Sequence, residues 1–549
     1  MSQYPPYLAD RVMSNEDALQ ETVKPGYTIA SGFATSEPLT FYEGLWDYIT
    51  ENDLSDLEIR QALFMGPHKI CVGDALSAKG VLGSGAGFLK KAPLLGPPLG
   101  KLDAATQKFK GLGLLINHYK ELQRRKIKFT SAFIGPATNI AIPDNIITRY
   151  LYPDFAGRNT TRMGITNMHS IHFPDAVNSM GYDSDGTPLI DTFVMVMTPP
   201  NEDGEMSHGP ANGANAELLD MVCQRKDMNV LLYINPKYPF TRGRNEAPNS
   251  INVKELEGLA KAGRLFVVED EGRIPALPAD SFKNPPEKEL AIADNIVNHI
   301  EMNKQYTYGR PIQVGIGGTG VLAIKNLKNS GWHGRSYTEM LEPFTLDLFE
   351  AGKIAGSHFV EKDGTRTQLD GKIVCTFTIC EENSDFYKRL DNNPAIILST
   401  ASRVVIPEGF QYGMGINNIL SIDFQGHVNA GGRDQNHYSG IGGSAMILRG
   451  LARGGVAYLC LKSVHNTPEG KLRSSIFPFM AQGTPFSHVG PDIWGGRDNA
   501  RIFLVTEHGV ARLSGKSQAE FIESLISVAD PQFRDWLKKE AWKEFRVKV

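Results

Sequence analysis

Short apolar runs alternate along the first half of the chain with longer segments in which polar and apolar positions are mixed. The runs predict strands at Thr28–Phe33, Phe129–Ile134, Phe193–Met197 and Asn229–Ile234, and the mixed pattern predicts a helix at about Leu39–Thr50. Alternating strands and helices are typical of an α/β architecture whose sheets are largely parallel.

The second half of the chain repeats this pattern after a segment, Asn235–Gly243, whose prolines and glycine cannot continue a strand or a helix. We expect a strand at Leu265–Val268 and a helix at Glu287–Asn303. The apolar positions that form one stripe of that helix are Leu290, Ile296, Val297 and Ile300. The chain is therefore predicted to form two tandem open α/β domains with largely parallel sheets, residues 1–248 and 249–549.

A loose internal repeat supports this division, and a separate segment predicts a long loop. Asp203-Gly-Glu-Met-Ser-His-Gly and Asp423-Phe-Gln-Gly-His-Val-Asn each follow an apolar strand and precede a Gly/Ala-rich helix start, as a loose internal repeat would. A segment rich in glycine and proline, at about residues 80–114, interrupts the first half and is predicted to be a long loop or lid.

Composition excludes several classes of protein. Of the 549 residues, 41% are hydrophobic and 21% charged, which is ordinary for a globular protein and excludes a mainly disordered chain. With 57 Lys+Arg and 61 Asp+Glu the net charge is -4, so a nucleic acid or a membrane surface is not expected as a partner.

The chain also shows neither a long apolar span nor a signal peptide at its start. A cytoplasmic location is expected. The five cysteines are not spaced for a zinc site or a disulfide framework.

The most informative local pattern is a glycine loop. The strand Pro311–Val314 leads into Gly315-Ile-Gly-Gly-Thr-Gly320, and a helical pattern follows, so backbone N–H groups of the loop can face an anion or an oxyanion. The letters match G-x-G-x-x-G, and Glu339 lies 19 residues after Gly320, which allows a dinucleotide-binding site. A tight turn without any ligand explains the same pattern.

Further segments around and beyond this loop help to decide between a ligand-binding loop and a simple turn. In chain order they are Ser336–Lys353, Ile416–Asn429, Ser439–Gly443, Val505–Lys516 and Asp530–Arg534. Together they resemble the acetyl-CoA hydrolase/transferase family, which includes acetate and 4-hydroxybutyrate CoA-transferases with a catalytic glutamate. The resemblance is strong from about residue 310 to 535 and weaker before residue 250.

The resemblance implies an acyl-CoA:carboxylate CoA-transferase with two CoA-transferase-like α/β domains, the second carrying the active site. Glu339 matches the family's nucleophile, which attacks the thioester to give an acyl-glutamyl anhydride and then a glutamyl-CoA thioester. Coenzyme A is a co-substrate, no separate cofactor or metal is implied, and the partners are an acyl-CoA and a small carboxylic acid. A homodimer or a higher homo-oligomer is expected.

The same resemblance assigns the two glycine loops. By this resemblance, Ile316 and Gly443 match residues whose backbone N–H groups serve as donors to an oxyanion or to the CoA carbonyl group. Such donors stabilise the charge of an intermediate best when they are preorganised in a site that excludes water. The residues expected beside CoA are Gly315, Gly317, Gly318, Ser439 and Gly442.

Three departures from the family pattern border the acyl site. Glu342-Pro343 replaces the usual Asp-Gly, Ser402 or Arg403 stands in place of an asparagine, and the usual aspartate after Gly443 is missing. Arg403 is either a partner for an acidic substrate group or a surface arginine. The alternatives to a transferase are an acyl-CoA hydrolase, an NAD-dependent oxidoreductase and a non-catalytic CoA-binding regulator.

A few other residues are weaker candidates. His169 and His172 are spaced for one helical face but lack a third metal ligand, so packing or turn roles are favoured over a metal site. His437 lies close in sequence to the Ser439–Gly443 loop. Candidates for holding the CoA phosphates are Lys471, Arg473 and Lys516.

Overall fold

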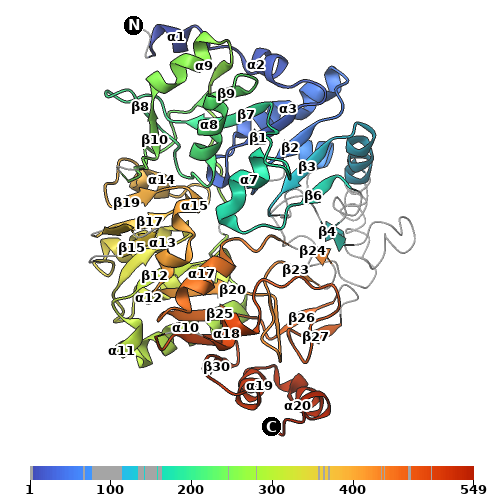
Figure 1. The fold of residues 1–549 in the computed structure, drawn as a ribbon, viewed down its shortest axis with the longest axis vertical. Coiled ribbons are helices and arrows are strands. Elements are labelled where there is room, and N and C mark those ends of the chain that lie inside the picture. The colour runs from blue at the N-terminus through green and yellow to red at the C-terminus, as the bar shows by residue number, and fades with distance from the viewer. Residues whose placement is uncertain are drawn as a thin grey trace, which may run out of the picture. The chain divides into compact units, whose positions relative to one another are not determined.

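The chain divides into two compact units (Figure 1). Unit 1 comprises Met1–Ser170, Asp175–Pro278 and Tyr387–Asn392, and unit 2 comprises Ile171–Pro174, Ala279–Phe386 and Asn393–Val549. The computed structural model describes residues 4–65, 68–76, 114–133, 141–142, 157–158, 164–244, 247–279, 281–355, 359–362, 365–368, 371–433, 436–437, 439–467, 471–495 and 498–549. The loop expected at 80–114 lies outside the described residues except for its last position.

Unit 1 is built on a seven-stranded sheet in which every strand pair is parallel. Across the sheet the strands are β11 (Leu265–Glu269), β9 (Asn229–Ile234), β7 (Thr192–Met197), β1 (Thr28–Ser31), β2 (Glu58–Arg60), β3 (Lys128–Ser131) and β6 (Thr166–Met168). The chain starts with β1 in the middle, adds β2, β3 and β6 on one side, and then adds β7, β9 and β11 on the other. All the strands expected in this part of the sequence are therefore present.

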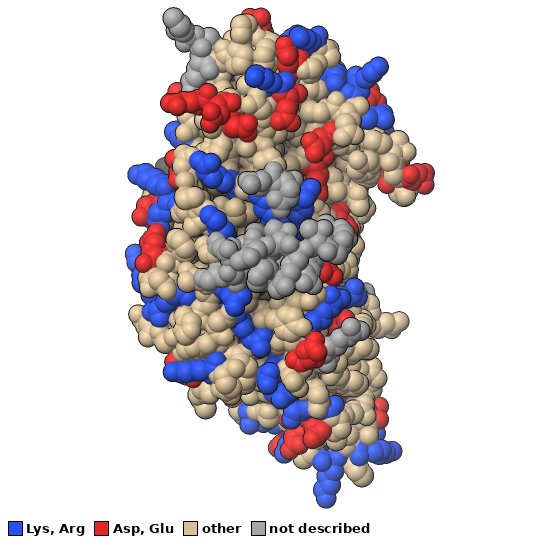
Figure 2. All heavy atoms as spheres, turned by 60° about the vertical axis from the view of Figure 1, so that its left-hand side comes forward, with Lys and Arg blue, Asp and Glu red and all other residues tan. Residues whose placement is uncertain are grey.

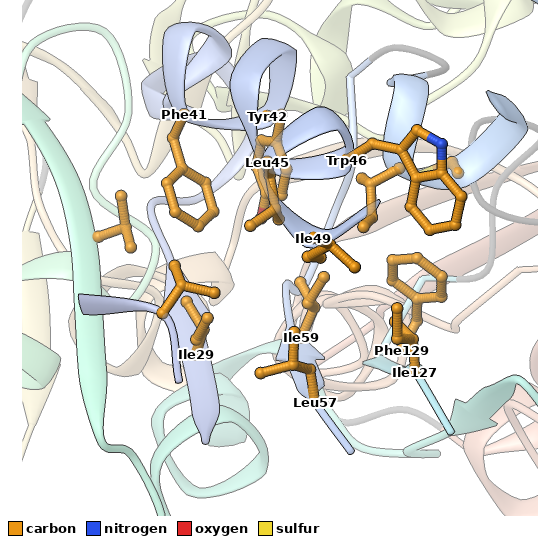
Figure 3. Close-up of a cluster of buried hydrophobic side chains, with 14 of the residues drawn as sticks. Ile29, Phe41, Tyr42, Leu45, Trp46, Ile49, Leu57, Ile59, Ile127 and Phe129 are labelled. Carbon is orange, nitrogen blue, oxygen red and sulfur yellow. The ribbon is translucent and has the colours of Figure 1, made fainter. Parts of the chain in front are cut away.

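Burial on both faces explains why these strands are continuous apolar runs. Every residue of β7 is buried. Helix α3 (Leu39–Glu51) packs its apolar face on the sheet, as Figure 3 shows. The labelled residues of this cluster are Phe41, Tyr42, Leu45, Trp46 and Ile49 from α3 and Ile29, Leu57, Ile59, Ile127 and Phe129 from and beside the strands. Each such side chain contributes about 1.5–3 kcal/mol when it is fully buried.

The other named helices of unit 1 are short. They are α1 (Pro6–Ala9), α2 (Asn15–Thr22), α4 (Lys69–Val72), α7 (Ala176–Gly181), α8 (Asn215–Gln224) and α9 (Glu257–Lys261). A two-stranded antiparallel sheet joins β8 (Glu205–Ser207) and β10 (Ser250–Asn252).

Unit 2 is built on an eight-stranded sheet with the same order of connections. Across the sheet the strands are β19 (Ile396–Leu398), β17 (Ile373–Cys375), β13 (Arg335–Tyr337), β12 (Pro311–Val314), β20 (Met414–Asn418), β25 (Val456–Cys460), β29 (Arg501–Thr506) and β30 (Gly509–Arg512). Only β30 is antiparallel to its neighbour. Here β12 starts in the middle, β13, β17 and β19 extend one side, and β20, β25 and β29 extend the other.

Helices of unit 2 include several that position the site described below. They are α10 (Glu287–Met302), α11 (Lys304–Thr307), α12 (Gly318–Leu327), α13 (Pro343–Glu350), α15 (Ala401–Val404), α16 (Pro407–Phe410), α17 (Ser444–Leu451), α18 (Gly490–Trp494), α19 (Gln518–Ser527) and α20 (Pro531–Phe545), and α14 (Phe386–Leu390) lies where the two units divide. The smaller strands are β14 (Met340–Leu341), β15 (Phe359–Lys362), β16 (Thr365–Gln368), β18 (Phe377–Thr378), β21 (Ser421–Asp423), β22 (Val428–Asn429), β23 (Gly432–Arg433), β24 (Asn436–His437), β26 (Val464–Asn466), β27 (Leu472–Ser474) and β28 (Ile476–Phe477).

The prediction of two tandem α/β domains with largely parallel sheets is confirmed. The two internal-repeat segments occupy equivalent places, since one follows β7 and the other begins at the end of β21 shortly after β20. The division between the units, however, falls after Pro278 rather than after residue 248. The reason is that β11 pairs with β9 and completes the first sheet, a long-range pairing that the local sequence does not encode.

The buried stripe of α10 also differs from the expected one. Ile292, Ala293, Ile296 and Ile300 are its buried residues, whereas Leu290 is 39% exposed and Val297 is only partly buried. The expected stripe was wrong at its start, where Ile292 and Ala293 are buried in place of Leu290.

The face drawn in Figure 2 carries basic and acidic side chains together, and neither sign covers it. Among the described residues, the structure contains no helix with both the length and the apolar character needed to cross a bilayer.

Candidate active site

The candidate site lies at the carboxyl edge of the unit 2 sheet, where the order of connections reverses between β12 and β20. Ligands of open α/β sheets bind at such a switch point. Backbone hydrogen bonds join two pairs of strand ends there. Gly315 N–H, after β12, donates to Ile416 O of β20 at 2.9 Å, and Thr376 N–H, after β17, donates to Glu339 O, after β13, at 3.1 Å. Gly315 and Glu339 therefore start from adjacent strands at the same edge.

Glu339 is a buried carboxyl group whose side chain has one hydrogen-bond partner among the described residues. It follows β13 by two residues, is 5% exposed, and accepts a hydrogen bond from Gly443 N–H at 2.9 Å on its Oε1. Burial raises the pKa of Glu339 to about 7, and the Gly443 bond opposes this shift. Near neutral pH a substantial fraction of Glu339 is therefore an ionised and poorly hydrated carboxylate.

Gly443 approaches this carboxylate because it lacks a side chain. It is the N-cap residue of α17, and a Cβ there would lie 2.8 Å from Glu339 Oε1 and closer still to Val405 Cγ1. Its φ of -82° is ordinary, so the glycine serves close approach rather than an unusual backbone. The preceding Gly442 has a φ of +61°, in the left-handed region that favours glycine.

The loop after β12 presents an unused donor. Ile316 is 45% exposed, and within the described part of the chain no acceptor is found for its backbone N–H. Asn418 Nδ2 donates to Ile316 O at 3.2 Å and fixes this peptide. Gly317, at φ +138°, lies against the same asparagine, where a side chain could not fit. The loop thus holds one N–H open at the switch point.

The start of α12 is less suited to a dinucleotide. A Cβ on Gly318 would collide with Glu289 Oε2, and Glu289 itself pairs with Lys462. A carboxylate therefore faces the helix start where the pyrophosphate of a dinucleotide would lie. The arrangement favours the Glu339 chemistry over the oxidoreductase hypothesis.

Ser439 is placed differently from the other expected site residues. Its backbone N–H donates to Gly431 O at 2.9 Å and extends the ladder between β23 and β24. The structure thus brings Glu339, Gly443 and Gly442 together and places Gly315, Ile316, Gly317 and Gly318 at the adjoining strand end, whereas the backbone contact of Ser439 is with the hairpin.

Glu342 and Pro343 have a structural explanation that the sequence analysis missed. Glu342 is fully buried and is the N-cap of α13, where its carboxylate accepts from Phe344 N–H at 2.6 Å, from Thr345 N–H at 3.1 Å and from the Thr345 hydroxyl. Pro343 occupies the first helical position, where no N–H is needed. The signal was available, because an acceptor side chain followed by proline is a typical helix start.

The remaining weaker candidates lie as follows. Arg403 is exposed on α15, and Thr400 Oγ1 lies 2.9 Å from Ser402 Oγ. Arg473 lies over the ring of Phe477 at 4.9 Å. The side chain of His437 is outside the described part of the chain.

The two histidines considered for a metal site belong to different units. His169 is in unit 1, where its Nδ1 lies 2.7 Å from Ser179 Oγ, and His172 is in unit 2. Over the residues that the structure describes, no group of three His, Cys, Asp or Glu side chains is placed to hold a metal ion.

Contacts with two distant segments were not anticipated. Phe173 N–H donates to Gly442 O at 3.1 Å, and His488 Nε2 lies 3.2 Å from Ser444 O. Both segments are far in sequence from the residues they contact, and no local pattern marks them.

Comparison with known proteins places these features in context. Residues 383–541 match the acetyl-CoA hydrolase/transferase C-terminal domain. The chain is 27% identical over 376 residues to butyryl-CoA:acetate CoA-transferase of Anaerostipes caccae, which covers 66% of this chain and 74% of the relative. It is 26% identical to 4-hydroxybutyrate coenzyme A transferase of Clostridium kluyveri over 65% of this chain and 73% of the relative. An acetyl-CoA hydrolase of Candida albicans is 24% identical over 75% of this chain and 79% of the relative.

Solved structures share the fold over nearly the whole chain. RipA from Yersinia pestis superimposes with a TM-score of 0.68 at 21% identity, covering 99% of this chain and 100% of that one. A 4-hydroxybutyrate CoA-transferase from Porphyromonas gingivalis superimposes with a TM-score of 0.60 at 19% identity, covering 98% and 99%.

Proposed function

The chain belongs to the acetyl-CoA hydrolase/transferase family, and on that premise we propose that it is an acyl-CoA:carboxylate CoA-transferase with Glu339 as its nucleophile. The observation that carries the proposal is the buried Glu339 carboxyl group, bonded to Gly443 N–H at the switch point of the sheet. The substrates proposed are an acyl-CoA and a small carboxylic acid.

The reaction begins when the Glu339 carboxylate attacks the thioester carbonyl. The tetrahedral adduct collapses by breaking the C–S bond, which gives an acyl-glutamyl anhydride and CoA thiolate. The thiolate attacks the glutamyl carbonyl, so that the original acyl group leaves as its carboxylate and a glutamyl-CoA thioester remains. An acceptor carboxylate then reverses both steps, which transfers CoA to the acceptor and regenerates Glu339.

Burial supports this chemistry in two ways. A carboxylate shielded from water is a stronger nucleophile than a hydrated one, and the raised pKa of Glu339, about 7, leaves a usable ionised fraction near neutral pH. A thioester is exchanged for an anhydride and then for another thioester, so no external energy source is required.

The two backbone donors are proposed to stabilise the developing negative charges. Gly443 N–H already contacts the glutamyl carboxylate, and it remains in reach when that group becomes the carbonyl attacked by thiolate. Ile316 N–H is proposed to donate a hydrogen bond to the acyl oxygen, since no acceptor among the described residues occupies it. Gly315, Gly317 and Gly318 form the loop that is proposed to lie beside CoA.

A hydrolase is the second candidate, because acetyl-CoA hydrolases are among the relatives and water needs only to reach the anhydride or the glutamyl thioester. The two functions share Glu339 and differ in the acceptor. A dry site favours transfer, since water competes with the carboxylate for the same intermediate.

Incubation with acetyl-CoA and one carboxylate at a time, from propionate, butyrate, 4-hydroxybutyrate and succinate, tests the proposal. Mass-spectrometric analysis of the CoA species should show a new acyl-CoA that requires the carboxylate, with the total thioester conserved. Free CoA formed at the same rate without any carboxylate would establish the hydrolase instead. The variant Glu339→Gln is the control, and it should form neither product.

A further inference from the structure

The turn before α17 is held from two sides besides its contact with Glu339. On one side Phe173 N–H donates to Gly442 O at 3.1 Å. On the other side the His488 ring approaches Ser444, with Nε2 3.2 Å from the carbonyl oxygen and 3.3 Å from Oγ. Gly443, which donates to Glu339, lies between these two clamped residues.

The contact of His488 with the Ser444 carbonyl oxygen indicates which ring nitrogen carries a proton. The carbonyl oxygen of Ser444 can only accept, so Nε2 carries the hydrogen and donates it. Nδ1 lies 2.8 Å from Ser487 Oγ, and the hydroxyl of Ser487 also donates to Val428 O at 3.1 Å. The ring is 2% exposed, and burial lowers the pKa of His488 to about 4, so it is neutral at physiological pH.

A proton on Nε2 does not suit the activation of Ser444 as a nucleophile. A base that activates a hydroxyl must offer it a free lone pair, and Nε2 is already protonated toward the Ser444 carbonyl. Asp492 and His172 are the other titratable side chains that act on the ring, together with the cation of Arg449. None of them is hydrogen-bonded to Nε2 among the contacts of the described residues.

The backbone around His488 is itself fixed. Val428 N–H donates to His488 O at 3.0 Å, and Ser487 N–H donates to Val428 O at 2.7 Å. Val428 belongs to β22, which pairs with β21. The imidazole is therefore attached to a small sheet rather than to a free loop.

We propose that His488 is a positioning residue that holds the turn before α17, so that Gly443 N–H stays directed at Glu339. The inference rests on the proposed function and extends it, since His488 acts on Glu339 through the Gly443 peptide and touches no substrate. A peptide displaced by about 1 Å can cost roughly 100-fold in rate, which is why a remote clamp can affect chemistry.

Two variants separate the clamp from a general packing role. His488→Leu removes the donor, whereas His488→Gln keeps an N–H donor at about the position of Nε2. We expect the kcat for transfer to fall about 10- to 100-fold in the Leu variant, with the KM for acyl-CoA changed less than about threefold, and the Gln variant to stay within about fivefold of wild type.

The pH profile gives a second signature. Loss of the Gly443 bond should move the acidic limb of kcat/KM to higher pH in His488→Leu, because that bond favours the ionised form of Glu339. Unchanged kcat and an unchanged limb in the Leu variant would overturn the proposal. An equally impaired but folded Gln variant would also overturn it.

Hydrogen exchange tests the clamp without any catalytic readout. The amide of Gly443 should exchange about tenfold faster in His488→Leu than in wild type, as followed in peptides spanning residues 439–451, and at nearly the wild-type rate in His488→Gln. Equal exchange in all three proteins would contradict the clamp even if transfer is observed. If the wild-type protein transfers no CoA, but the Gly443 amide still exchanges faster in His488→Leu than in wild type and His488→Gln, the proposed function is refuted and the role of His488 in holding the turn is retained.

Discussion

At the scale of single residues, the electrostatics of Glu339 decide whether it can act as a nucleophile. Burial favours the protonated form, and the Gly443 N–H favours the carboxylate. The structure combines both effects, so the group is neither a permanently ionised surface acid nor a permanently protonated core residue.

A pH dependence follows from the direction of this shift. Only the ionised carboxylate attacks, and the pKa of Glu339 is raised to about 7, so kcat/KM for acyl-CoA should rise as the pH increases from about 5.5 to 8 and then level off. Initial rates in buffers of constant ionic strength measure this profile. An activity that is already maximal at pH 5.5 would show that Glu339 is not the titrating nucleophile.

Gly443 offers a test of the close approach. An alanine there would place a methyl group 2.8 Å from Glu339 Oε1 and against Val405, so Gly443→Ala should lower kcat at least about 100-fold and destabilise the fold by about 1–3 kcal/mol.

Gly258 in α9 provides the matched control for that substitution, since a Cβ there meets nothing within 4 Å. Gly258→Ala should leave the rate unchanged and leave stability equal or slightly higher. Steady-state kinetics and urea unfolding of both variants give the comparison. A Gly443→Ala protein as active as Gly258→Ala would mean that the N–H contact is not used.

At the scale of elements, helix capping explains why Glu342-Pro343 stands in place of the Asp-Gly that is usual in the family. Glu342 replaces a residue near the nucleophile but serves as the buried N-cap of α13. Its three acceptor contacts are structural, and none of them is directed at Glu339.

Removal of this cap should therefore affect stability more than chemistry. Glu342→Ala is expected to destabilise the protein by about 1–3 kcal/mol, because three donors at the start of α13 lose their acceptor. Glu342→Gln, which keeps one acceptor oxygen, should lose less. Urea unfolding monitored by circular dichroism measures both effects. An Ala variant of wild-type stability would contradict the capping role.

The elements differ in how far the sequence predicts them. β7, β9 and β12 were expected within a residue of their observed ends, because strands buried on both faces appear as continuous apolar runs flanked by turn residues. The glycine loop after β12 was equally visible. The end of unit 1 at Pro278 could not be predicted from the local sequence, because it depends on the pairing of β11 with β9.

The residues of the candidate site also differ in how far the sequence predicts them. The motifs around Glu339 and Gly443 identified two residues that the structure brings into contact, while their catalytic roles stay predictions. Phe173 and His488 could not be predicted, since their contacts with the α17 turn join segments that are remote in sequence. The backbone N–H of Ser439 donates to Gly431 O beside the β23–β24 hairpin, and its place beside CoA stays a prediction.

At the scale of the whole molecule, the two units repeat one topology but differ at equivalent positions. Gly32 N–H donates to Val194 O at 2.9 Å in unit 1, just as Gly315 N–H donates to Ile416 O at 2.9 Å in unit 2. Ala62 follows β2 by two residues, as Glu339 follows β13. Unit 1 therefore lacks a carboxylate at the position of the proposed nucleophile.

The donor position differs in the same way. Phe33 N–H, which corresponds to Ile316 N–H, is occupied by Asn215 Oδ1 at 3.1 Å. The equivalent N–H of unit 2 has no acceptor among the described residues. Asn215 thus occupies the donor of unit 1, whereas the equivalent donor of unit 2 is left without a described acceptor, which supports the proposal that unit 2 carries the chemistry.

The central claim is that Glu339 becomes covalently attached to CoA during turnover. The most direct measurement is to incubate the protein with acetyl-CoA, stabilise the adduct with borohydride, and locate the modification by peptide mass spectrometry. We predict a modification on Glu339 that a carboxylate discharges before trapping and that Glu339→Gln does not form. Transfer without any modification of Glu339, or with a modification on another residue, would contradict the account.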